Sequence, residues 1–126
     1  MNLLALRRTV SRLCIVGAAC TLAACASAPP TLYAWGSYED LLYVAQAKPG
    51  SLSPEAQADQ LEKDRQTAEA ARKRLPPGWH AHLASLYAQS GRADLAEREL
   101  LAEKSGFPES TTLVDRLLAN LRGSKP

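Results

Sequence analysis

The stretch that decides the fold is PGWHAHLASLYAQSGRADLAERELLAEKSGFPES, residues 77–110. Its large apolar side chains recur every three to four residues and so share one face of a helix; they are Trp79, Leu83, Leu86 and Tyr87. The Ser-Gly pair at 90–91 ends that helix, and a second helix is expected over about 93–104, with Ala96 and Leu100 facing inward. The stretch therefore predicts a helical hairpin.

A further helix is predicted after the break that Gly106 and Pro108 introduce. It spans residues 111–122, and its apolar positions form one stripe; they are Leu113, Val114, Leu117, Leu118 and Leu121. Because a single hairpin cannot bury both of its faces, this helix is expected to cap one side of it. Residues 123–126 are expected to be a tail.

Two more helices are predicted before the hairpin, over about 37–47 and 53–74. Ser37 precedes the first, with Asp40 as a weak capping box. A Ser-Pro pair opens the second, which is very polar and is expected to be a mostly solvated helix along one side of the domain. Its thin apolar stripe consists of Ala58, Leu61, Ala68, Ala71 and Leu75. Since no stretch alternates like a strand, we predict an all-α domain over residues 32–122, with one helix pair and a capping helix.

Residues 1–24 have the organisation of a bacterial secretion signal. A basic start is followed by an uncharged run over 13–22, about half the length of a membrane-spanning helix. The sequence Leu22-Ala23-Ala24-Cys25 then resembles the lipobox of bacterial lipoproteins, which implies cleavage after Ala24 and a lipid on the Cys25 thiol. Residues 25–31 become a lipidated tether. The alternative is an ordinary signal cleaved near Ala28.

The charge of the chain belongs largely to this signal. Cleavage removes Arg7, Arg8 and Arg12 and changes the formal net charge from +2 to −1. Because the mature chain is not basic, we predict no nucleic-acid partner. Ala26 follows the cysteine where inner-membrane lipoproteins tend to carry Asp. This resemblance implies an outer-membrane lipoprotein on the periplasmic face, and an inner-membrane location stays open.

Residues 77–110 also resemble one 34-residue tetratricopeptide repeat. The matching positions are Leu83, Ala84, Tyr87, Gly91, Ala96, Leu100 and Pro108. Two of them are Ala, as close helix crossing requires, and the larger side chains fill the space beside the crossing. Glu103 departs from the pattern, since a small residue is usual there, and Trp79 is displaced by one position. No second copy is found, and a generic helical hairpin is the alternative.

The residues give little sign of catalysis. His80 and His82 are two apart, which places them on different sides of a helix, so we predict neither a metal site nor a cofactor. Ser85 has no acid–base arrangement around it in sequence. The acidic side chains of 53–74 alternate with basic ones, as on a solvated helix. We therefore expect no enzyme; the alternative is a small cell-envelope enzyme acting on peptidoglycan or lipid.

Aromatic residues are the candidate contact surface for a protein partner. They are Tyr33, Trp35, Tyr38 and Trp79. Tyr and Trp dominate the energetically important positions of interfaces. The alternative, which we favour because other large apolar residues are few, is that the aromatic group formed by Tyr33, Trp35, Tyr38 and Tyr43 packs against the 79–90 helix as half of the core.

Three segments together are similar to a family of small bacterial lipoproteins known only as a domain of unknown function. They are YAWGSY at 33–38, PPG at 76–78 and AEKSGFPES at 102–110. The resemblance covers about residues 31–118. Members are typically encoded beside a lipoprotein resembling the curli secretion channel, which implies a non-enzymatic accessory or scaffold role in a cell-envelope assembly, with an envelope protein as partner. The family supplies no catalytic residues.

Overall fold

The computed structural model describes residues 31–123, and the fold within them is all-α, as predicted. The elements in order are α2 (Tyr38–Ala47), α3 (Pro54–Ala70), α4 (Trp79–Gln89), α5 (Ala93–Gly106), the 3-10 turn η1 (Pro108–Ser110) and α6 (Thr111–Gly123). No strand occurs in this part of the chain; one isolated β-bridge joins Tyr33 and Arg74. The proposed signal, its cleavage residues Leu22, Ala23 and Ala24, and Cys25 lie outside the described residues.

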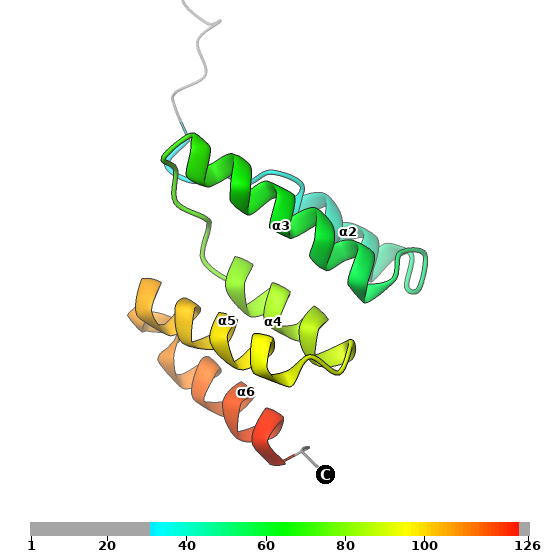
Figure 1. The fold of residues 1–126 in the computed structure, drawn as a ribbon, viewed down its shortest axis with the longest axis vertical. Helices are drawn as coiled ribbons and strands as arrows, with labels where there is room; N and C mark the ends of the chain where they lie inside the picture. Colours follow the sequence, from blue (N-terminus) through cyan, green and yellow to red (C-terminus); the bar gives the residue numbers. More distant parts are fainter. Residues whose placement is uncertain (1–30, 124–126) are drawn as a thin grey trace, which may run out of the picture. The chain divides into compact units, whose positions relative to one another are not determined.

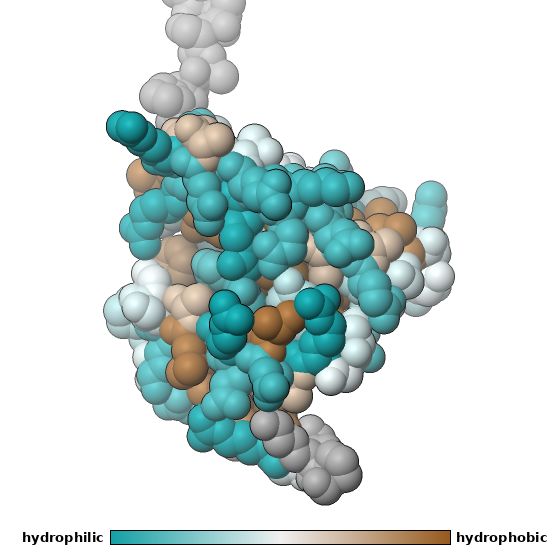
Figure 2. Space-filling view, in the orientation of Figure 1, coloured by the Kyte–Doolittle hydropathy of each residue, from teal (hydrophilic) through white to brown (hydrophobic). Residues whose placement is uncertain are grey.

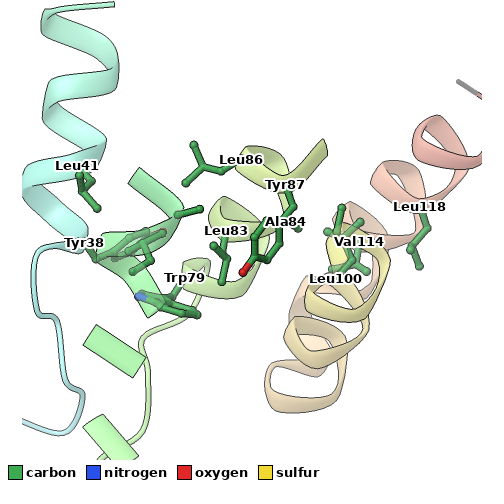
Figure 3. Packing of buried hydrophobic residues seen from close by; sticks show 13 residues of the cluster. Tyr38, Leu41, Trp79, Leu83, Ala84, Leu86, Tyr87, Leu100, Val114 and Leu118 are labelled. Atoms are coloured by element: carbon green, nitrogen blue, oxygen red, sulfur yellow. The ribbon is translucent and has the colours of Figure 1, made fainter. Parts of the chain in front are cut away.

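The helices follow one another in space in the order of the sequence. Figure 1 shows α2 beside α3, then the hairpin of α4 and α5, then α6. One hydrophobic cluster draws on every helix, and Figure 3 shows its packing; its members are Tyr38, Leu41, Ala58, Leu61, Trp79, Leu83, Ala84, Leu86, Tyr87, Ala96, Leu100, Val114 and Leu118. Because α4 supplies five of these residues, it is the central helix of the domain.

The α4–α5 hairpin turns as the sequence predicts. Gly91 has a φ of +72°, a left-handed conformation that costs glycine little. The Arg92 N–H then donates to the Tyr87 carbonyl at 2.8 Å, which satisfies one of the last carbonyls of α4. The chain therefore reverses within three residues, and α5 packs directly against α4.

The serines before α2 and α3 differ in their roles. Ser53 caps α3, since its Oγ accepts from the Ala56 N–H at 3.2 Å, and Pro54 occupies the first helical position. Ser37 makes no such cap. Its N–H donates instead to the Asp64 carboxylate at 2.8 Å, and its hydroxyl donates to the same group. The predicted capping box at Ser37 is therefore wrong, because a carboxylate of α3 takes both donors.

Helix α3 ends at Ala70, four residues before the predicted end. Arg72 adopts a φ of +53°, and the Lys73 N–H donates back to the Ala68 carbonyl at 2.9 Å. This is the Schellman arrangement that closes many helices, here with an arginine where glycine is usual. The following residues run extended, and the Ala34 N–H donates to the Arg74 carbonyl at 2.8 Å. That pairing and the two prolines after it prevent the helix from continuing.

Helix α6 buries a narrower stripe than its sequence suggests. Val114 and Leu118 are buried, and Leu117 and Leu121 are half-buried. Leu113, predicted to face inward, is 55% exposed, because it lies at the edge of the strip that contacts α5. Gly123, predicted as the start of a tail, is the last residue of α6.

Candidate functional site

The described residues form an open, mostly apolar groove between α4 and α6, with α5 as its floor. Its volume is about 390 Å³. The lining residues are Ala81, Ala84, Ser85 and Ala88 with Gln89 of α4, Ala96 and Leu100 of α5, and Leu117, Asn120 and Leu121 of α6. Most of these side chains are apolar, and the polar ones carry no charge. The groove is thus suited to apolar groups rather than to ions.

Small side chains on α4 leave this space open. Ala81, Ala84 and Ala88 are spaced three and four residues apart, so they lie in one row along the helix. At a rise of 1.5 Å per residue, the row is about 10 Å long. Leu117 and Leu121 are four residues apart and form the opposite wall on α6. Ala88 is exposed, and Ala81, Leu117 and Leu121 are half-buried, whereas Ala84 is buried between the two other alanines.

Most of the residues predicted to pack the helix pair are buried in the structure. Five of them are buried, with exposed fractions of 5% or less; they are Leu83, Ala84, Tyr87, Ala96 and Leu100. Gly91 forms the turn, and Pro108 is the first residue of η1. Of these, Ala84, Ala96 and Leu100 also reach the groove. The same small residues thus allow close helix packing and shape the open surface.

The aromatic residues considered as partner contacts divide between core and surface. Trp79 is 0% exposed and Tyr38 is 7% exposed, so neither is available to a partner; both belong to the core cluster. Tyr33 is half-buried, and Trp35 is 39% exposed. The Trp35 ring stacks on Tyr38 with centroids 6.4 Å apart and meets Tyr33 edge to face at 6.4 Å. The group thus links the segment before α2 to the core, with Trp35 at its outer edge. Tyr43 of α2 is 68% exposed, so the prediction that it packs in the core is wrong.

A charged network joins α3, α4 and α5. Arg65 of α3 lies 2.8 Å from a Glu99 oxygen of α5 and 3.2 Å from Glu62, one turn before it. His80 of α4 contacts the second Glu99 oxygen at 2.7 Å through Nδ1. The Arg65 guanidinium also lies over the Trp79 ring, 5.1 Å from its centroid. On the mostly solvated helix that the sequence predicts for α3, Glu62 and Arg65 are exceptions, because they contact Tyr87 of α4 and Glu99 of α5.

The pKa values in this network are those of stable ion pairs. Burial alone would raise the pKa of Glu99, but hydrogen bonds from His80 and Arg65 outweigh it and lower that pKa. Burial likewise opposes the charge of Arg65, and its pairing with Glu99 and Glu62 raises its pKa. Burial and the hydrogen bond that Tyr87 donates to Glu62 at 2.6 Å raise the pKa of Tyr87 to about 12. The network thus stabilises fixed charges and offers no group prepared for acid catalysis.

The histidines and Ser85 have separate environments. His82 lies against the Tyr38 ring, with centroids 5.8 Å apart, and burial lowers its pKa. The Ser85 hydroxyl donates to the His82 backbone carbonyl at 2.7 Å, so it does not contact either imidazole. Across residues 31–123, no three His, Cys, Asp or Glu side chains come close enough to hold a metal ion. Within the same range, no helix has the length and apolar character needed to cross a bilayer.

Glu103 is a residue whose role the sequence did not reveal. It is 1% exposed, and its Oε1 accepts from the Gly78 N–H at 2.7 Å. Burial raises the pKa of Tyr38, and the nearby Glu103 carboxylate raises it further. The one signal in the sequence is that Glu103 departs from the repeat pattern. The structure explains this departure. The Glu103 carboxylate accepts a hydrogen bond from the Gly78 N–H just before α4, and a small residue at position 103 would leave that N–H without this acceptor.

The comparisons with known proteins agree with the resemblance to a domain of unknown function. Residues 32–117 match a family described as a domain of unknown function, DUF4810. No curated protein and no solved structure matches the chain. The family match begins at Leu32, the first residue of the folded unit, and ends at residue 117, so it covers α2 to α5 and the first half of α6. The chain therefore belongs to the DUF4810 family.

Proposed function

We propose that this protein is a non-enzymatic accessory lipoprotein of the bacterial cell envelope, anchored in the outer membrane through Cys25, that binds a protein partner in the α4–α6 groove. The observation that carries the proposal is the apolar groove that the row of Ala81, Ala84 and Ala88 lines on the central helix. Apolar surface of this kind on a small domain is usually a binding site. The lipobox sequence at 22–25 supports the anchor.

The chemistry of the groove favours an amphipathic helix as the occupant. A helix presents apolar side chains at positions i, i+3 or i+4 and i+7, over the same length as the alanine row. The small residues of α4 allow close approach of such a helix, and Ser85, Gln89 and Asn120 supply polar groups at the rim. A partner of this kind needs no complementary charge within the groove.

The resemblance to a tetratricopeptide unit supports the same assignment. In the described domain, α4 and α5 form the helix pair, and α6 follows as the first helix of a further unit would. The first candidate for the partner is a cell-envelope lipoprotein resembling the curli secretion channel, because members of the resembled family are typically encoded beside one. This candidate rests on that resemblance alone.

The test is site-specific photocrosslinking in living cells. A photoreactive amino acid replaces Ala88, which is exposed and lines the groove, or Ala56, which is exposed on α3 outside it. We expect an adduct with a specific envelope protein from position 88 and none from position 56. Ala88→Arg, which fills the groove with a charged side chain, is expected to abolish the complex, and Ala56→Arg to preserve it.

Cys25→Ala separates the anchor from the groove. The variant is expected to leave the outer-membrane fraction and to lose the adduct at position 88. Equal adducts from positions 88 and 56 would contradict the groove assignment. Unchanged fractionation of Cys25→Ala would contradict the anchor. Turnover of peptidoglycan or lipid by the purified protein, without any captured partner, would favour the enzyme alternative.

A further inference from the structure

We propose that the end of the domain where the tether joins it is a membrane-facing surface that binds anionic phospholipid headgroups. This tether-end surface consists of Leu32, Trp35, Arg72, Lys73 and Arg74. The inference rests on the lipid anchor of the proposed function, adds a second membrane contact to it, and is independent of the groove.

Backbone pairing brings these residues together. The β-bridge between Tyr33 and Arg74, with the Ala34 N–H on the Arg74 carbonyl at 2.8 Å, places the first described residues beside the end of α3. The start of the described chain lies at this end of α3 in Figure 1. The three basic residues follow directly after α3, and all are exposed. The chain therefore enters the domain next to its basic run.

The side chains here have the chemistry of a membrane interface. Leu32 is 73% exposed and Trp35 is 39% exposed, so two apolar groups accompany the basic ones. Trp is favoured at the headgroup level of bilayers, and Lys and Arg are attracted to anionic lipids. Figure 2 shows hydrophilic residues over most of the visible face, including the end where the described chain begins. The surface thus combines an apolar contact with positive charge.

The charge balance at this end stays positive. Glu69 lines a hollow of about 270 Å³ together with Lys73 and Arg74, and Asp64 accepts hydrogen bonds from Ser37. Arg74 is partly engaged, since its guanidinium donates to the Gly106 carbonyl at 3.2 Å and lies over the Phe107 ring. Arg72, Lys73 and Arg74 all remain exposed, so each can contact a headgroup.

The length of the tether keeps this surface near the bilayer. Cys25 and Leu32 are seven residues apart, which a fully extended chain covers in at most about 25 Å. Attraction between exposed charges and a membrane acts over roughly one Debye length, about 8 Å at physiological salt. The anchor thus holds the domain within reach of the bilayer, and the basic end is the part that the tether brings closest to it.

The test uses the only thiol of the mature chain. The chain from residue 25 onward is alkylated at Cys25 with one tetradecyl chain, which alone gives only marginal, reversible membrane binding. Its partitioning is measured by flotation with vesicles of phosphatidylcholine, or of phosphatidylethanolamine and phosphatidylglycerol. At about 1 kcal/mol for each basic side chain near the surface, we expect anionic vesicles to be preferred by roughly tenfold to thirtyfold.

Charge-matched variants identify the surface. Arg72→Gln with Lys73→Gln is expected to reduce the preference on the order of tenfold. Lys48→Gln with Arg98→Gln removes the same charge from exposed positions in the α2–α3 loop and on α5, and is expected to leave the preference unchanged. High salt is expected to remove the preference in the unsubstituted chain.

Two outcomes would overturn the proposal: equal partitioning into both vesicle types, or an equal loss in both pairs of variants. Because the acyl chain is attached chemically, the result depends neither on lipobox processing nor on a partner. A failure here leaves the crosslinking test of the groove unaffected, and a failure of that test leaves this one unaffected.

Discussion

Arg65 of α3 and Glu99 of α5 form a 2.8 Å ion pair directly beside the buried ring of Trp79, at the start of α4. The pair links two helices that are separated in sequence by the whole of α4. His80 contacts the same carboxylate, so Glu99 is paired with one side chain of α3 and one of α4. The buried Trp79 ring is therefore covered on one side by the charged Arg65 guanidinium.

Removing one partner of this pair is expected to destabilise the domain. Glu99→Ala leaves Arg65 and His80 without their shared acceptor, and we expect the free energy of unfolding to fall by about 3 kcal/mol. The double variant Arg65→Met with Glu99→Leu removes both charges, and we expect its free energy of unfolding to fall clearly less than that of Glu99→Ala. Chemical denaturation at pH 7 measures both variants. A double variant less stable than Glu99→Ala would show that the pair itself, rather than an orphaned charge, supplies the stability.

Acid is expected to destabilise the domain through His82. Burial lowers the pKa of His82 below its ordinary value of 6.5, so the unfolded chain binds its proton more readily than the folded chain. The neutral imidazole therefore contributes its full stability above pH 6.5, and that contribution is lost as the pH falls below it. The pKa of Glu99 is also lowered, so its contribution is lost in turn below its ordinary value of 4.5.

The measurement is the free energy of unfolding between pH 5 and pH 7.5. His82→Gln removes the titrating group from its place against the Tyr38 ring, and the slope across this range is expected to become shallower. A substitution at an exposed position of α3, Ala56→Gln, serves as the control and is expected to keep the original slope. An unchanged slope in His82→Gln would contradict the assignment.

The two tryptophans are expected to respond very differently to truncation. Trp79 is fully buried, and Trp79→Ala is expected to cost about 3–5 kcal/mol of stability or to prevent folding. Trp35→Ala removes a partly exposed ring that stacks on Tyr38, and is expected to cost about 1 kcal/mol or less. Thermal unfolding followed by circular dichroism compares the two. A comparable loss for both would show that Trp35 is also part of the core.

The sequence predicts the helices better than their contacts. The 3.6-residue pattern of the 77–110 stretch identifies α4 and α5 because their apolar positions depend on local geometry alone. The end of α3 was missed because it depends on pairing between Tyr33 and Arg74, forty-one residues apart. The network at Glu99 was missed for the same reason: a charged residue on a polar face looks solvated until the fold places Arg65 beside it.

The groove was only partly predictable. The small residues of α4 were expected to allow close packing with α5, and Ala84 does so. That Ala81 and Ala88 face an open space depends on how far α6 lies from α4, which no local pattern encodes. The position of Trp79 in the core, rather than at a contact surface, likewise depends on α3 covering it.

Arg72 is expected to be a site where substitution stabilises the domain. Its φ of +53° is unfavourable for a residue with a Cβ, by roughly 1–2 kcal/mol in the left-handed region. Arg72→Gly removes that strain at the closing position of α3, and we expect a gain of about 1 kcal/mol in the free energy of unfolding. Arg72→Ala keeps the strain while also removing the charge, and is expected to gain nothing. Equal gains in both variants would point to charge rather than backbone conformation.

Glu103 tests how far the repeat resemblance describes this domain. If the position followed the repeat pattern, Glu103→Ala would be tolerated, because a small residue is usual there. The structure predicts the opposite, since the carboxylate accepts from the Gly78 N–H and fills a space that is 1% exposed. We expect Glu103→Ala to lower the free energy of unfolding by about 2–3 kcal/mol, because the Gly78 N–H loses its acceptor and a cavity opens. Glu103→Gln retains an oxygen at the same position and is expected to lose less than half as much. Urea denaturation measures the free energy of unfolding of the two variants. If Glu103→Ala is as stable as the natural chain, the hydrogen bond to Gly78 does not hold α4 in place. The repeat pattern alone would then account for the hairpin.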